Sequence, residues 1–531
     1  MLGFCPYSYP VTSPSTLRSG ALSLASSVVI GVASAGPAYS ITATLGLVVA
    51  AVGLQSPVIV LLAFVPMLLV AIGYRDLNEV EPDPGTTFVW ATRAFGPFTG
   101  WMAGWAIVVS DLLVMASLAQ ISSQYTFLLF GAKGIGSDAT SPWVLLLGIV
   151  YLIVMTLVAV RGIDASARLQ SSLLTIEFGM LVVFAVVALT RVLLGHAPAG
   201  SSLPHWEWFN PFAIGSFNDF VTALLLMVFI YWGWDSAVAV NQETVDPRHT
   251  PGRSAVLSTI TLVGLYLLVT VAAQAFAGTG TDGLGLANPE HVDDVLGALG
   301  AAVFGEGMIG QVLVHLLFLM VLTSAAASTQ TTILPTARTT YSMALHHALP
   351  KAFAKIDPRY RTPVFSTWMF GGLSIVLYVV LNFASGGRLI ADAVTAIGIS
   401  IGLYYGLTGV SCAWLYRDRF ATSPRTLVMK GLLPAAGGFA LLFAAGWTAV
   451  TSWQPAEDTA SWQLPFPPHW HIGSTFLLGV GTLLLGVPIY LILAKVMPPF
   501  FRGDVLARRL PQPSETIIES DAIEPGAVPR A

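Results

Sequence analysis

The sequence predicts an all-α membrane protein with twelve transmembrane helices. Of its 531 residues, 55% are hydrophobic and only 10% are charged, whereas a soluble domain carries about 25% charged residues. The hydrophobic residues form continuous runs as long as the roughly 20 residues with which a helix crosses a bilayer. Strands of a membrane β-barrel would instead alternate apolar with polar residues. This composition excludes an ordinary soluble enzyme, a disordered chain and a nucleic-acid-binding protein, which needs a basic surface.

The apolar runs place the helices in order along the chain. They cover residues 20–50, 56–76, 97–130, 142–161, 171–195, 215–241, 254–278, 308–345, 364–383, 391–416, 430–451 and 472–497. The resulting divisions are an N-terminal tail (1–19), helices 1–5 (20–197), helices 6–10 (212–417), helices 11 and 12 (430–498) and a C-terminal tail (499–531). The C-terminal tail mixes proline with acidic residues and has no helical periodicity, which predicts disorder.

The distribution of cations supports this count of helices. If the N-terminus is cytoplasmic, all but three of the 24 lysines and arginines fall on the cytoplasmic side, and the three outside are Lys133, Arg191 and Arg388. Membrane proteins carry such an excess of cations in their cytoplasmic loops. One helix more or fewer would reverse the sidedness of every later loop. We therefore predict a multi-pass protein of the plasma membrane with both termini in the cytoplasm.

The start of helix 1 allows one alternative. Arg18, the apolar run 21–32 and the triplet Ala33-Ser34-Ala35 have the pattern of a cleaved signal peptide. The apolar run continues to about residue 53, however, and cleavage would leave an incomplete first helix. We therefore expect the segment to remain as a membrane helix.

No catalytic residues, metal site or cofactor is expected. The two cysteines, Cys5 and Cys412, are too few for a disulfide framework or a cysteine zinc site. The sequence has no glycine-rich phosphate loop and no HExxH motif. The predicted cytoplasmic loops are too short to hold a catalytic domain. A membrane enzyme would also need acids or histidines gathered at one interface, and the acids here are dispersed along the chain.

Two predicted helices are interrupted at corresponding positions. Helix 1 contains Ser34-Ala35-Gly36-Pro37, and helix 6 contains Trp232-Gly233-Trp234-Asp235. Proline removes a backbone donor, and glycine relaxes the backbone. Paired interruptions in two halves are typical of transporters whose site lies at discontinuous helices. Freed N–H groups can hold a substrate carboxylate, and freed carbonyls can hold an ammonium group. The alternative is a simple kink, because glycine and proline are common in membrane helices, but the matched pair favours a site.

Three acids fall within the predicted spans, namely Asp111, Glu177 and Asp235. A charged group at the bilayer centre costs at least about 2.5–3.5 kcal/mol, so it usually faces a cavity and has a function. No lysine or arginine lies deep in a span to neutralise these acids. A bound cation, a proton or a water-filled cavity is therefore expected beside them. The alternative is a protonated or internally paired acid that joins helices, and for Glu177 the two interpretations stay open.

Other polar residues mark both ends of helix 8 and its middle. Hydroxyls spaced one turn apart, Ser324, Ser328 and Thr332, share a face and can line a site, although small residues also serve close helix packing. The loop 279–307 before it holds five acids and no lysine or arginine. Such a loop either collects cations at the outer mouth or is simply solvated. At the other end, His346 is expected to be solvated in the cytoplasm.

Three segments resemble the amino acid–polyamine–organocation (APC) superfamily of secondary transporters. The segment FIYWGWDSAVAVNQETVDPRHTPGRS (229–254) resembles helix 6 of that superfamily and the loop that follows. The segment ARTTYSMALHHALPKAFAKIDPRYRTP (337–363) is similar to the region after helix 8, and FGPFTGW (95–101) to the start of helix 3. The resemblance covers nearly the whole chain. It implies a five-plus-five inverted repeat with discontinuous helices 1 and 6, plus two extra helices, and transport by alternating access.

The resemblance also implies roles for individual residues. In helix 1 the substrate carboxylate would be held by Ser34, Ala35, Gly36 and Pro37. In helix 6 Phe229 would be an aromatic gate, while the break and the acidic position would be formed by Trp232, Gly233 and Asp235. The side-chain pocket would be lined from helix 3 by Ser110 and Asp111 and from helix 8 by Ser328 and Thr332. Glu177 and Ser328 would hold the coupling ion or proton.

Two departures from the superfamily pattern matter. Helix 1 contains SAGPAYS in place of the usual GxG run, which leaves its backbone path open. Some proton-coupled members keep a lysine in helix 5 where this chain has Glu177. A carboxylate there suits either a proton or sodium as the coupling ion.

These observations predict a secondary active transporter, a symporter or antiporter, for an amino acid or related amine. Asp111 in the pocket favours a basic amino acid or a polyamine, because a buried carboxylate facing an ammonium offsets part of the desolvation cost of both. If Asp111 instead pairs with a neighbouring helix, a neutral amino acid is an equal candidate. The remaining alternative is a membrane sensor or scaffold with the same fold. The paired helix breaks argue against it, because a scaffold needs no central cavity.

Overall fold

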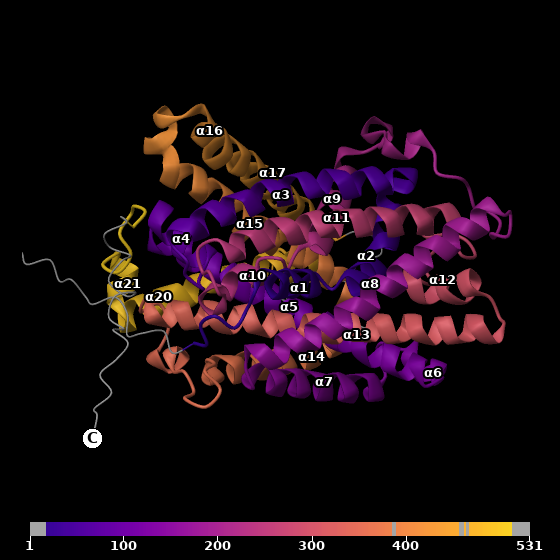
Figure 1. Ribbon diagram of the computed structural model, residues 1–531, viewed down its shortest axis with the longest axis horizontal. Coiled ribbons are helices and arrows are strands. Elements are labelled where there is room, and N and C mark those ends of the chain that lie inside the picture. Colours follow the sequence, from indigo (N-terminus) through magenta and orange to yellow (C-terminus); the bar gives the residue numbers. More distant parts are fainter. Residues whose placement is uncertain (1–16, 385–388, 456–460, 464–466, 512–531) are drawn as a thin grey trace, which may run out of the picture.

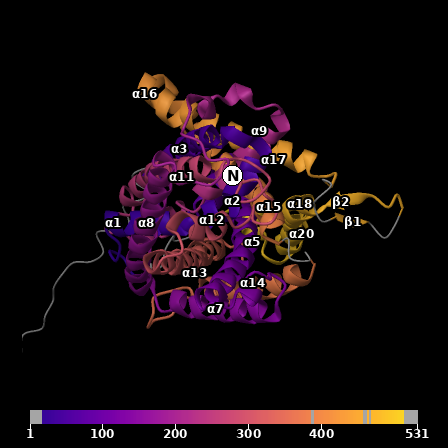
Figure 2. The ribbon, with the colours of Figure 1, turned by 90° about the vertical axis from the view of Figure 1, so that its right-hand side faces the viewer.

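The computed structural model describes residues 17–384, 389–455, 461–463 and 467–511. Over these residues the chain forms a bundle of long helices that run along the longest axis of the molecule (Figure 1). Viewed from the end that carries α12 (Figure 2), α2, α5 and α12 lie near the middle of the bundle, and a two-stranded hairpin projects from its edge. The two ends of the bundle are called here the α4 end and the α12 end.

The helices and strands have the following bounds. They are α1 (Leu24–Ala35), α2 (Pro37–Val52), α3 (Ser56–Val80), α4 (Thr87–Phe95), α5 (Pro97–Leu129), α6 (Lys133–Gly136), α7 (Pro142–Val160), α8 (Ile163–Leu193), α9 (Phe217–Tyr231), α10 (Ser236–Ala239), α11 (Thr250–Ala277), α12 (Val295–Phe304), α13 (Met308–Leu345), α14 (Val364–Ala384), α15 (Leu389–Tyr416), α16 (Pro424–Thr426), α17 (Leu433–Thr451), α18 (Ser474–Phe476), α19 (Thr482–Leu484), α20 (Gly486–Val496) and α21 (Pro498–Arg502), with strands β1 (Ser461–Gln463) and β2 (His471–Gly473).

Among the described residues, ten helical segments are long and apolar enough to cross a membrane. The count is lower than the predicted twelve for two reasons. The segment Leu24–Val80 counts once although it is interrupted at Gly36 and again at the short turn Gly53–Gln55. Phe217–Tyr231 is apolar but shorter than the others because helix 6 breaks after it. The chain is therefore an all-α membrane protein, and the twelve-span inverted repeat remains a prediction.

Both predicted helix interruptions are present. Gly36 has a φ of 53°, in the left-handed region, where it ends α1, and Pro37 then opens α2. Proline suits this first-turn position, because the N–H that it lacks would have no helical partner there. In helix 6, Trp232 is extended and Gly233 has a φ of 114°, so that α9 and the short α10 are separate helices. Each interruption thus contains a residue with backbone freedom that other residues rarely have.

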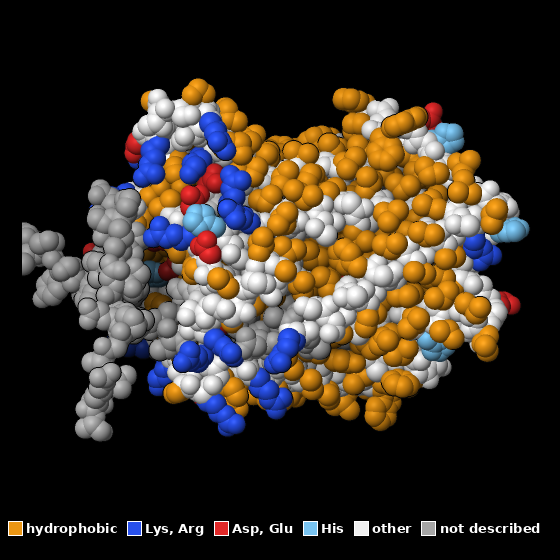
Figure 3. Space-filling view, in the orientation of Figure 1, with side chains coloured by type: hydrophobic (Ala, Val, Ile, Leu, Met, Phe, Trp, Pro, Cys, Tyr) orange, Lys and Arg blue, Asp and Glu red, His pale blue; other side chains and the backbone are white. Residues whose placement is uncertain are grey.

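The surface of the bundle is apolar along its length and charged at one end. Hydrophobic side chains cover the middle of the molecule, and lysines and arginines gather at the α4 end (Figure 3). The exposed hydrophobic residues include Val150, Val186 and Val376 on three different helices. Such a surface is stable in contact with lipid tails, whereas in water it would mark an aggregation site.

Two segments are more ordered than the sequence suggests. Residues 499–511 of the predicted disordered tail complete α21 and pack on the α4 end, where Phe500 lies 5.2 Å from Phe88, ring centre to ring centre. The free energy gained by burying this aromatic side chain offsets the conformational entropy that the segment loses when it is ordered. The loop 279–307 contains the helix α12, which packs against α13. Residues 1–16 and 512–531 of the predicted tails lie outside the described residues.

Candidate functional site

The two helix breaks meet at a small cavity within the bundle. Its volume is about 10 Å³, so it has room for about one water molecule. The side chains and backbone that line it belong to Ser34, Thr86, Ile107, Asp111, Trp232, Gly233, Asp235, Ser236, Ala239, Thr332, Pro335 and Thr339. The cavity is thus built from α1, α5, α10, α13, the break after α9 and the turn before α4.

Direct contacts lock the two breaks together. The hydroxyls of Ser34 and Ser236 lie 2.7 Å apart, and the hydroxyl of Ser328 donates to the carbonyl of Ser34 at 2.9 Å. A Cβ atom added to Gly233 would lie 2.7 Å from the carbonyl carbon of Ser34. Glycine at this position therefore allows the backbone of helix 6 to approach helix 1 more closely than any side chain would permit.

The N-terminus of α2 is occupied by the protein's own Glu177. One carboxylate oxygen of Glu177 accepts the backbone N–H of Ala38 at 2.6 Å and the hydroxyl of Ser324 at 2.6 Å. The Ser324 hydroxyl in turn accepts the N–H of Tyr39 at 3.2 Å. These contacts satisfy first-turn donors that have no partner within the helix, at the end where the helix dipole favours a negative charge. In this conformation the backbone donors of Ala38 and Tyr39, directly after the predicted Ser34–Pro37 site, are therefore engaged by the protein's own side chains.

The second oxygen of Glu177 has a different environment. Its atom Oε2 is buried and has no hydrogen-bond partner among the residues that the structure describes. A buried carboxylate oxygen without a donor is costly. A proton on that oxygen, or a cation beside it, removes this cost.

The two other acids of the predicted spans, buried Asp111 and half-buried Asp235, line the cavity but differ in their partners. Asp235 accepts hydrogen bonds from the phenols of Tyr405 at 2.8 Å and Tyr404 at 3.2 Å, both on α15. Asp111 accepts one side-chain hydrogen bond, from Thr336 on α13. Asp235 is thus held by two donors, whereas Asp111 has unused acceptor capacity that faces the cavity.

The predicted site residues fall into three groups. The cavity is lined by Ser34, Asp111, Trp232, Gly233, Asp235 and Thr332. Around it, without lining it, lie Ala35, Gly36, Pro37, Phe229, Glu177 and Ser328. Phe229 packs between Tyr39 and Trp232, with ring centres 6.3 Å from each. Ser110 is not brought to the cavity, because its hydroxyl donates to Ala106 and Ile107 in its own helix.

Several lining residues were not predicted from the sequence. Thr339 lies seven residues after Thr332 and Pro335 lies three after it, so the helical period of α13 is a signal that could have found them. Tyr404 and Tyr405, which do not line the cavity but hold Asp235, lie in an apolar run of α15 and give no such signal. Thr86 reaches the cavity from the turn before α4, where its φ of 44° is unusual for a residue other than glycine. Only the tertiary structure shows this contribution.

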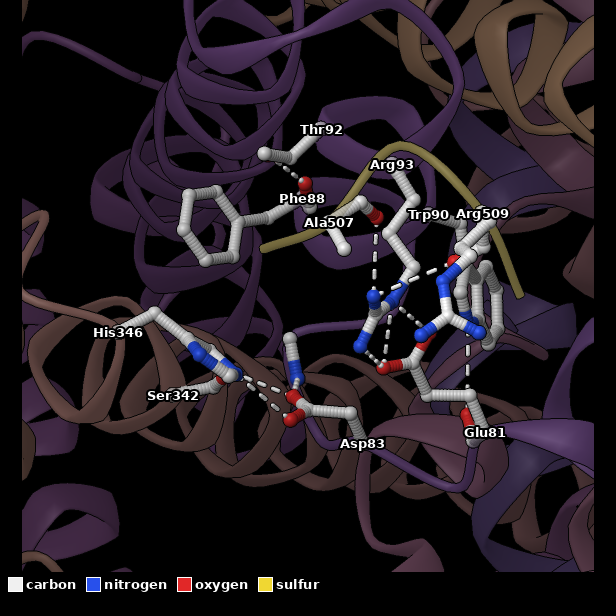
Figure 4. Close-up of polar contacts among 11 residues, drawn as sticks. Glu81, Asp83, Phe88, Trp90, Thr92, Arg93, Ser342, His346, Ala507 and Arg509 are labelled. Atoms are coloured by element: carbon white, nitrogen blue, oxygen red, sulfur yellow. Dashed lines mark hydrogen bonds and ion pairs between the residues drawn. The ribbon is translucent and has the colours of Figure 1, made fainter. Parts of the chain in front are cut away.

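Polar contacts at the α4 end join α4 and the turn before it to the C-terminal segment and to the end of α13 (Figure 4). Glu81 pairs with Arg93 at 2.6 Å, and Arg93 also donates to the carbonyls of Ala507 at 3.0 Å and Arg509 at 3.2 Å. His346, directly after the end of α13, contacts Asp83 at 3.0 Å. The expectation that His346 is solvated is therefore wrong, because the turn before α4 folds back onto α13 and covers it.

The charge of Asp83 is stabilised by this arrangement. Burial by itself raises the pKa of the Asp83 carboxyl. The positive charge and hydrogen bond of His346, together with hydrogen bonds from Ser342 and the N–H of Gly85, bring that pKa below its ordinary value. Asp83 is therefore an ionised partner for His346 at neutral pH.

A buried ion pair completes the closure. Arg338 on α13 pairs with Glu243 in the turn after α10, and both side chains are 1% exposed. The backbone of Glu243 also accepts the N–H of Leu22, and the N–H of Val245 donates to Leu22, each at 3.0 Å. The start of helix 1 is thus fastened to the segment after helix 6. These contacts hold the start of helix 1, the turn after α10 and α13 together at the α4 end.

Comparison with known proteins places these features in a family context. The sequence profile of a family described as amino acid permease matches residues 19–495. A branched-chain amino acid permease of Lactococcus lactis subsp. cremoris is 25% identical over 367 residues, which cover 64% of this chain and 72% of the relative. An arginine/ornithine antiporter of the same organism is 23% identical over 411 residues, covering 72% of this chain and 76% of the relative. A methylthioribose transporter of Bacillus subtilis is 21% identical over 370 residues, covering 66% and 74% respectively.

Proposed function

The chain belongs to the amino acid permease family of the APC superfamily, and from this premise we propose that it is a secondary active transporter for a cationic amino acid or related amine. Transport proceeds by alternating access of the central cavity to the two sides of the membrane. A basic amino acid or a polyamine is the favoured substrate class. No catalytic residue and no cofactor takes part.

The environment of Asp111 is the observation that carries this proposal. Its carboxylate lines the central cavity, has a single side-chain donor in Thr336, and is 4% exposed. Among the described residues, no lysine or arginine forms an ion pair with it. A substrate ammonium or guanidinium group would supply the missing positive charge and offset the cost of burying the carboxylate. The closed cavity must widen to admit such a group, as alternating access requires.

Glu177 is the proposed carrier of the coupling ion. It joins α8 to Ser324 on α13 and to the start of α2 through one oxygen, and its other oxygen is buried without a hydrogen-bond partner among the described residues. A proton or sodium ion bound there would be released if α2 moved, because the Ala38 contact would be lost. Ion occupancy and the position of helix 1 are thus linked through one carboxylate.

The proposed orientation puts the α4 end in the cytoplasm of a plasma-membrane protein. The lysines and arginines gather at that end (Figure 3), in agreement with the excess expected for cytoplasmic loops. The closed contacts around Arg338 and Glu243 then form the cytoplasmic barrier.

A neutral amino acid is the second candidate substrate. Relatives from Lactococcus lactis and Bacillus subtilis are named as branched-chain amino acid permeases, whereas another relative is named as an arginine/ornithine antiporter. Names within the family therefore favour neither class. If Asp111 serves only to bind Thr336, the substrate needs no positive charge.

The proposal is tested by uptake into proteoliposomes. Labelled arginine, lysine, putrescine, leucine and isoleucine are offered with an imposed proton gradient or a sodium gradient. We expect accumulation of a cationic substrate, and we expect Asp111→Asn to reduce it by about tenfold or more, as loss of a buried charge contact would.

Ser110→Ala is the matched control, because Ser110 is adjacent to Asp111 but bonds only within its own helix. It should transport like the unaltered protein. Equal effects of Asp111→Asn on cationic and neutral substrates would contradict the cationic assignment. Folded protein that takes up none of the five compounds would contradict the proposed substrate class as a whole.

A further inference from the structure

A second cavity at the α12 end is much larger than the central one. Its volume is about 1030 Å³, at the upper limit of the range usual for small-molecule sites. Its walls are the last turns of α5, the short α6, the segment before α12, α12 itself and the first turns of α13. Under the proposed orientation it opens to the outside of the cell.

The cavity is strongly acidic. Four of its lining residues are acids, namely Glu290, Asp293, Asp294 and Glu306, and Lys133 is the one lysine or arginine that lines it among the described residues. Within the described part of the chain, none of these acids forms an ion pair with a lysine or arginine. Arg191, another predicted outer cation, donates instead to the carbonyls of Ala302 and Val303. Arg388 lies outside the described residues.

The acids are arranged from the mouth of the cavity inward. Glu290 and Glu306 are exposed, whereas Asp293 and Asp294 are half-buried. Asp294 accepts the hydroxyl of Tyr125 and the N–H of Gly297, so its position is fixed by α5 and α12. Burial raises the pKa of Asp294 to about 6, although the Tyr125 hydrogen bond opposes this. A cation in the cavity would favour the ionised carboxylate.

An unpartnered amide faces the same cavity and is independent of the acids. Gln120 lies on α5 and is 1% exposed, and both its Nε2 and its Oε1 lack hydrogen-bond partners among the described residues. Leaving a buried amide without partners costs about 1–3 kcal/mol on the scale of protein mutations. A ligand that supplies a donor and an acceptor would remove this cost.

The cavity is separate from the central site. Gln120 lies nine residues after Asp111 on α5, a distance of about 13 Å along the helix. Between them, the hydroxyl of Ser117 on α5 bonds that of Tyr39 on α2 at 2.7 Å, and Phe229 packs on Tyr39. These contacts form a barrier that a ligand in the outer cavity has not yet crossed.

We propose that the outer cavity is a second binding site, specific for an organic cation that bears an ammonium or guanidinium group. The acids Glu290, Asp293 and Asp294 attract and hold the positive charge, while the amide of Gln120 binds a polar group of the same molecule. An organic ligand is favoured over a metal ion, because the described residues contain no group of three or more histidine, cysteine or acidic side chains placed to hold a metal. The role of this site as a step before transport rests on the proposed function, whereas the binding of a cation there does not.

The test measures equilibrium binding of labelled L-arginine, with L-leucine as the neutral probe, to the purified full chain. The central site is disabled by Asp111→Asn, so that any remaining arginine binding reports on the outer cavity. We expect this variant to retain arginine binding that weakens as salt is added. Adding Glu290→Gln and Asp293→Asn should weaken the remaining binding by about tenfold. Leucine binding should be unchanged by these outer substitutions.

Asp282→Asn is the matched control, because Asp282 is an exposed acid of the same loop that does not line the cavity. It should bind arginine as before. Gln120→Leu removes the amide at similar volume and should also weaken the remaining binding. If Gln120→Leu does not fold, the exposed charge variants decide the question.

Two results would overturn the outer site, and both differ from a failure of the proposed function. The outer site is contradicted if Asp111→Asn abolishes all arginine binding, or if Glu290→Gln with Asp293→Asn changes it no more than Asp282→Asn does. The proposed central site is contradicted if Asp111→Asn alters neither the number of bound arginines nor their uptake. In that case the effect of Glu290→Gln with Asp293→Asn on arginine binding still tests the outer site independently.

Discussion

At the scale of single residues, the buried carboxylates differ in how completely the fold satisfies them. Asp235 receives two phenol donors, and one oxygen of Glu177 receives two donors while the other receives none. Asp111 receives a single hydroxyl. The well-satisfied acid is suited to hold the break in helix 6, and the other two are suited to bind something that the protein does not itself supply.

Replacing Glu177 by glutamine separates binding from coupling. The amide oxygen of Glu177→Gln can still accept from Ala38 and Ser324, so the start of α2 should stay in place. The amide cannot exchange a proton and holds a cation weakly. We expect exchange of substrate across the membrane to continue while accumulation driven by an ion gradient falls about tenfold or more.

Counterflow and gradient-driven uptake in the same proteoliposomes measure the two activities. Glu207→Gln, an exposed acid in the loop before α9, is the control and should change neither. Undiminished accumulation by Glu177→Gln would remove Glu177 from the coupling mechanism.

At the scale of elements, the breaks in helices 1 and 6 are one structural unit. Gly36 and Gly233 both have positive φ angles, and the backbone of one break fills the space beside the other. Ser34, Ser236 and Ser328 then join the two breaks and α13 by hydrogen bonds. Small residues are required here, because unwound backbone at membrane depth is stable only when it is packed against protein.

The substitution Gly233→Ala tests this unit. A methyl group would lie 2.7 Å from the Ser34 carbonyl carbon, and alanine rarely adopts a φ of 114°. We expect a loss of about 2–4 kcal/mol of stability, together with loss of substrate binding, because helix 6 must retreat from helix 1. The measurements are thermal unfolding in detergent and arginine binding.

Gly264→Ala provides the comparison. Gly264 lies inside α11, and a methyl group added there would meet no other atom within 4 Å, so alanine should stabilise the helix by up to about 1 kcal/mol. If Gly233→Ala behaved like Gly264→Ala, the close contact between the breaks would have no structural importance.

At the scale of the whole molecule, the protein is closed at the α4 end and hollow at the α12 end. The central cavity has about 10 Å³, whereas the outer cavity has about 1030 Å³. The α4 end is held by the Arg338–Glu243 pair, the Leu22 backbone contacts and the Asp83–His346 contact. Opening toward this end must break several polar contacts together, which suits a barrier with two discrete states.

Breaking the buried pair should open this barrier. Glu243→Gln leaves the Arg338 charge buried without its partner, which costs about 3–5 kcal/mol, whereas adding Arg338→Met should recover most of that loss. After both natural cysteines are replaced by serine, a Thr339→Cys substitution at the cavity reports access. Its reaction with a water-soluble thiol reagent should become faster in Glu243→Gln.

The double variant Glu243→Gln with Arg338→Met is the control for charge burial. It should unfold near the temperature of the unaltered protein and still react faster than the parent cysteine variant, because the ion pair is absent. Equal reaction rates in all three proteins would show that the pair does not guard the cavity.

Much of the candidate site could be predicted from the sequence because its signals are local. A glycine beside a proline in an apolar run marks the break at Gly36, and an acid in an apolar run marks Asp111 and Asp235. Each signal reflects the free-energy cost of placing a polar or flexible group at membrane depth. This cost can be judged from the local sequence without knowing the fold. Ser110 shows the limit of such reasoning, since a position beside Asp111 on α5 faces a different direction.

The sequence by itself determined that this chain is a helical membrane protein, which helices are interrupted, and that Asp111 and Glu177 lie within spans, because hydrophobic length and local backbone freedom act within short segments. The tertiary structure alone decided the partners of those groups. It joined Glu177 to the start of α2 and Tyr404 and Tyr405 to Asp235, and it placed Gln120 and the acids Glu290, Asp293 and Asp294 around one cavity. These contacts connect residues from distant parts of the chain, and they depend on helix packing angles and rotations that no single segment specifies.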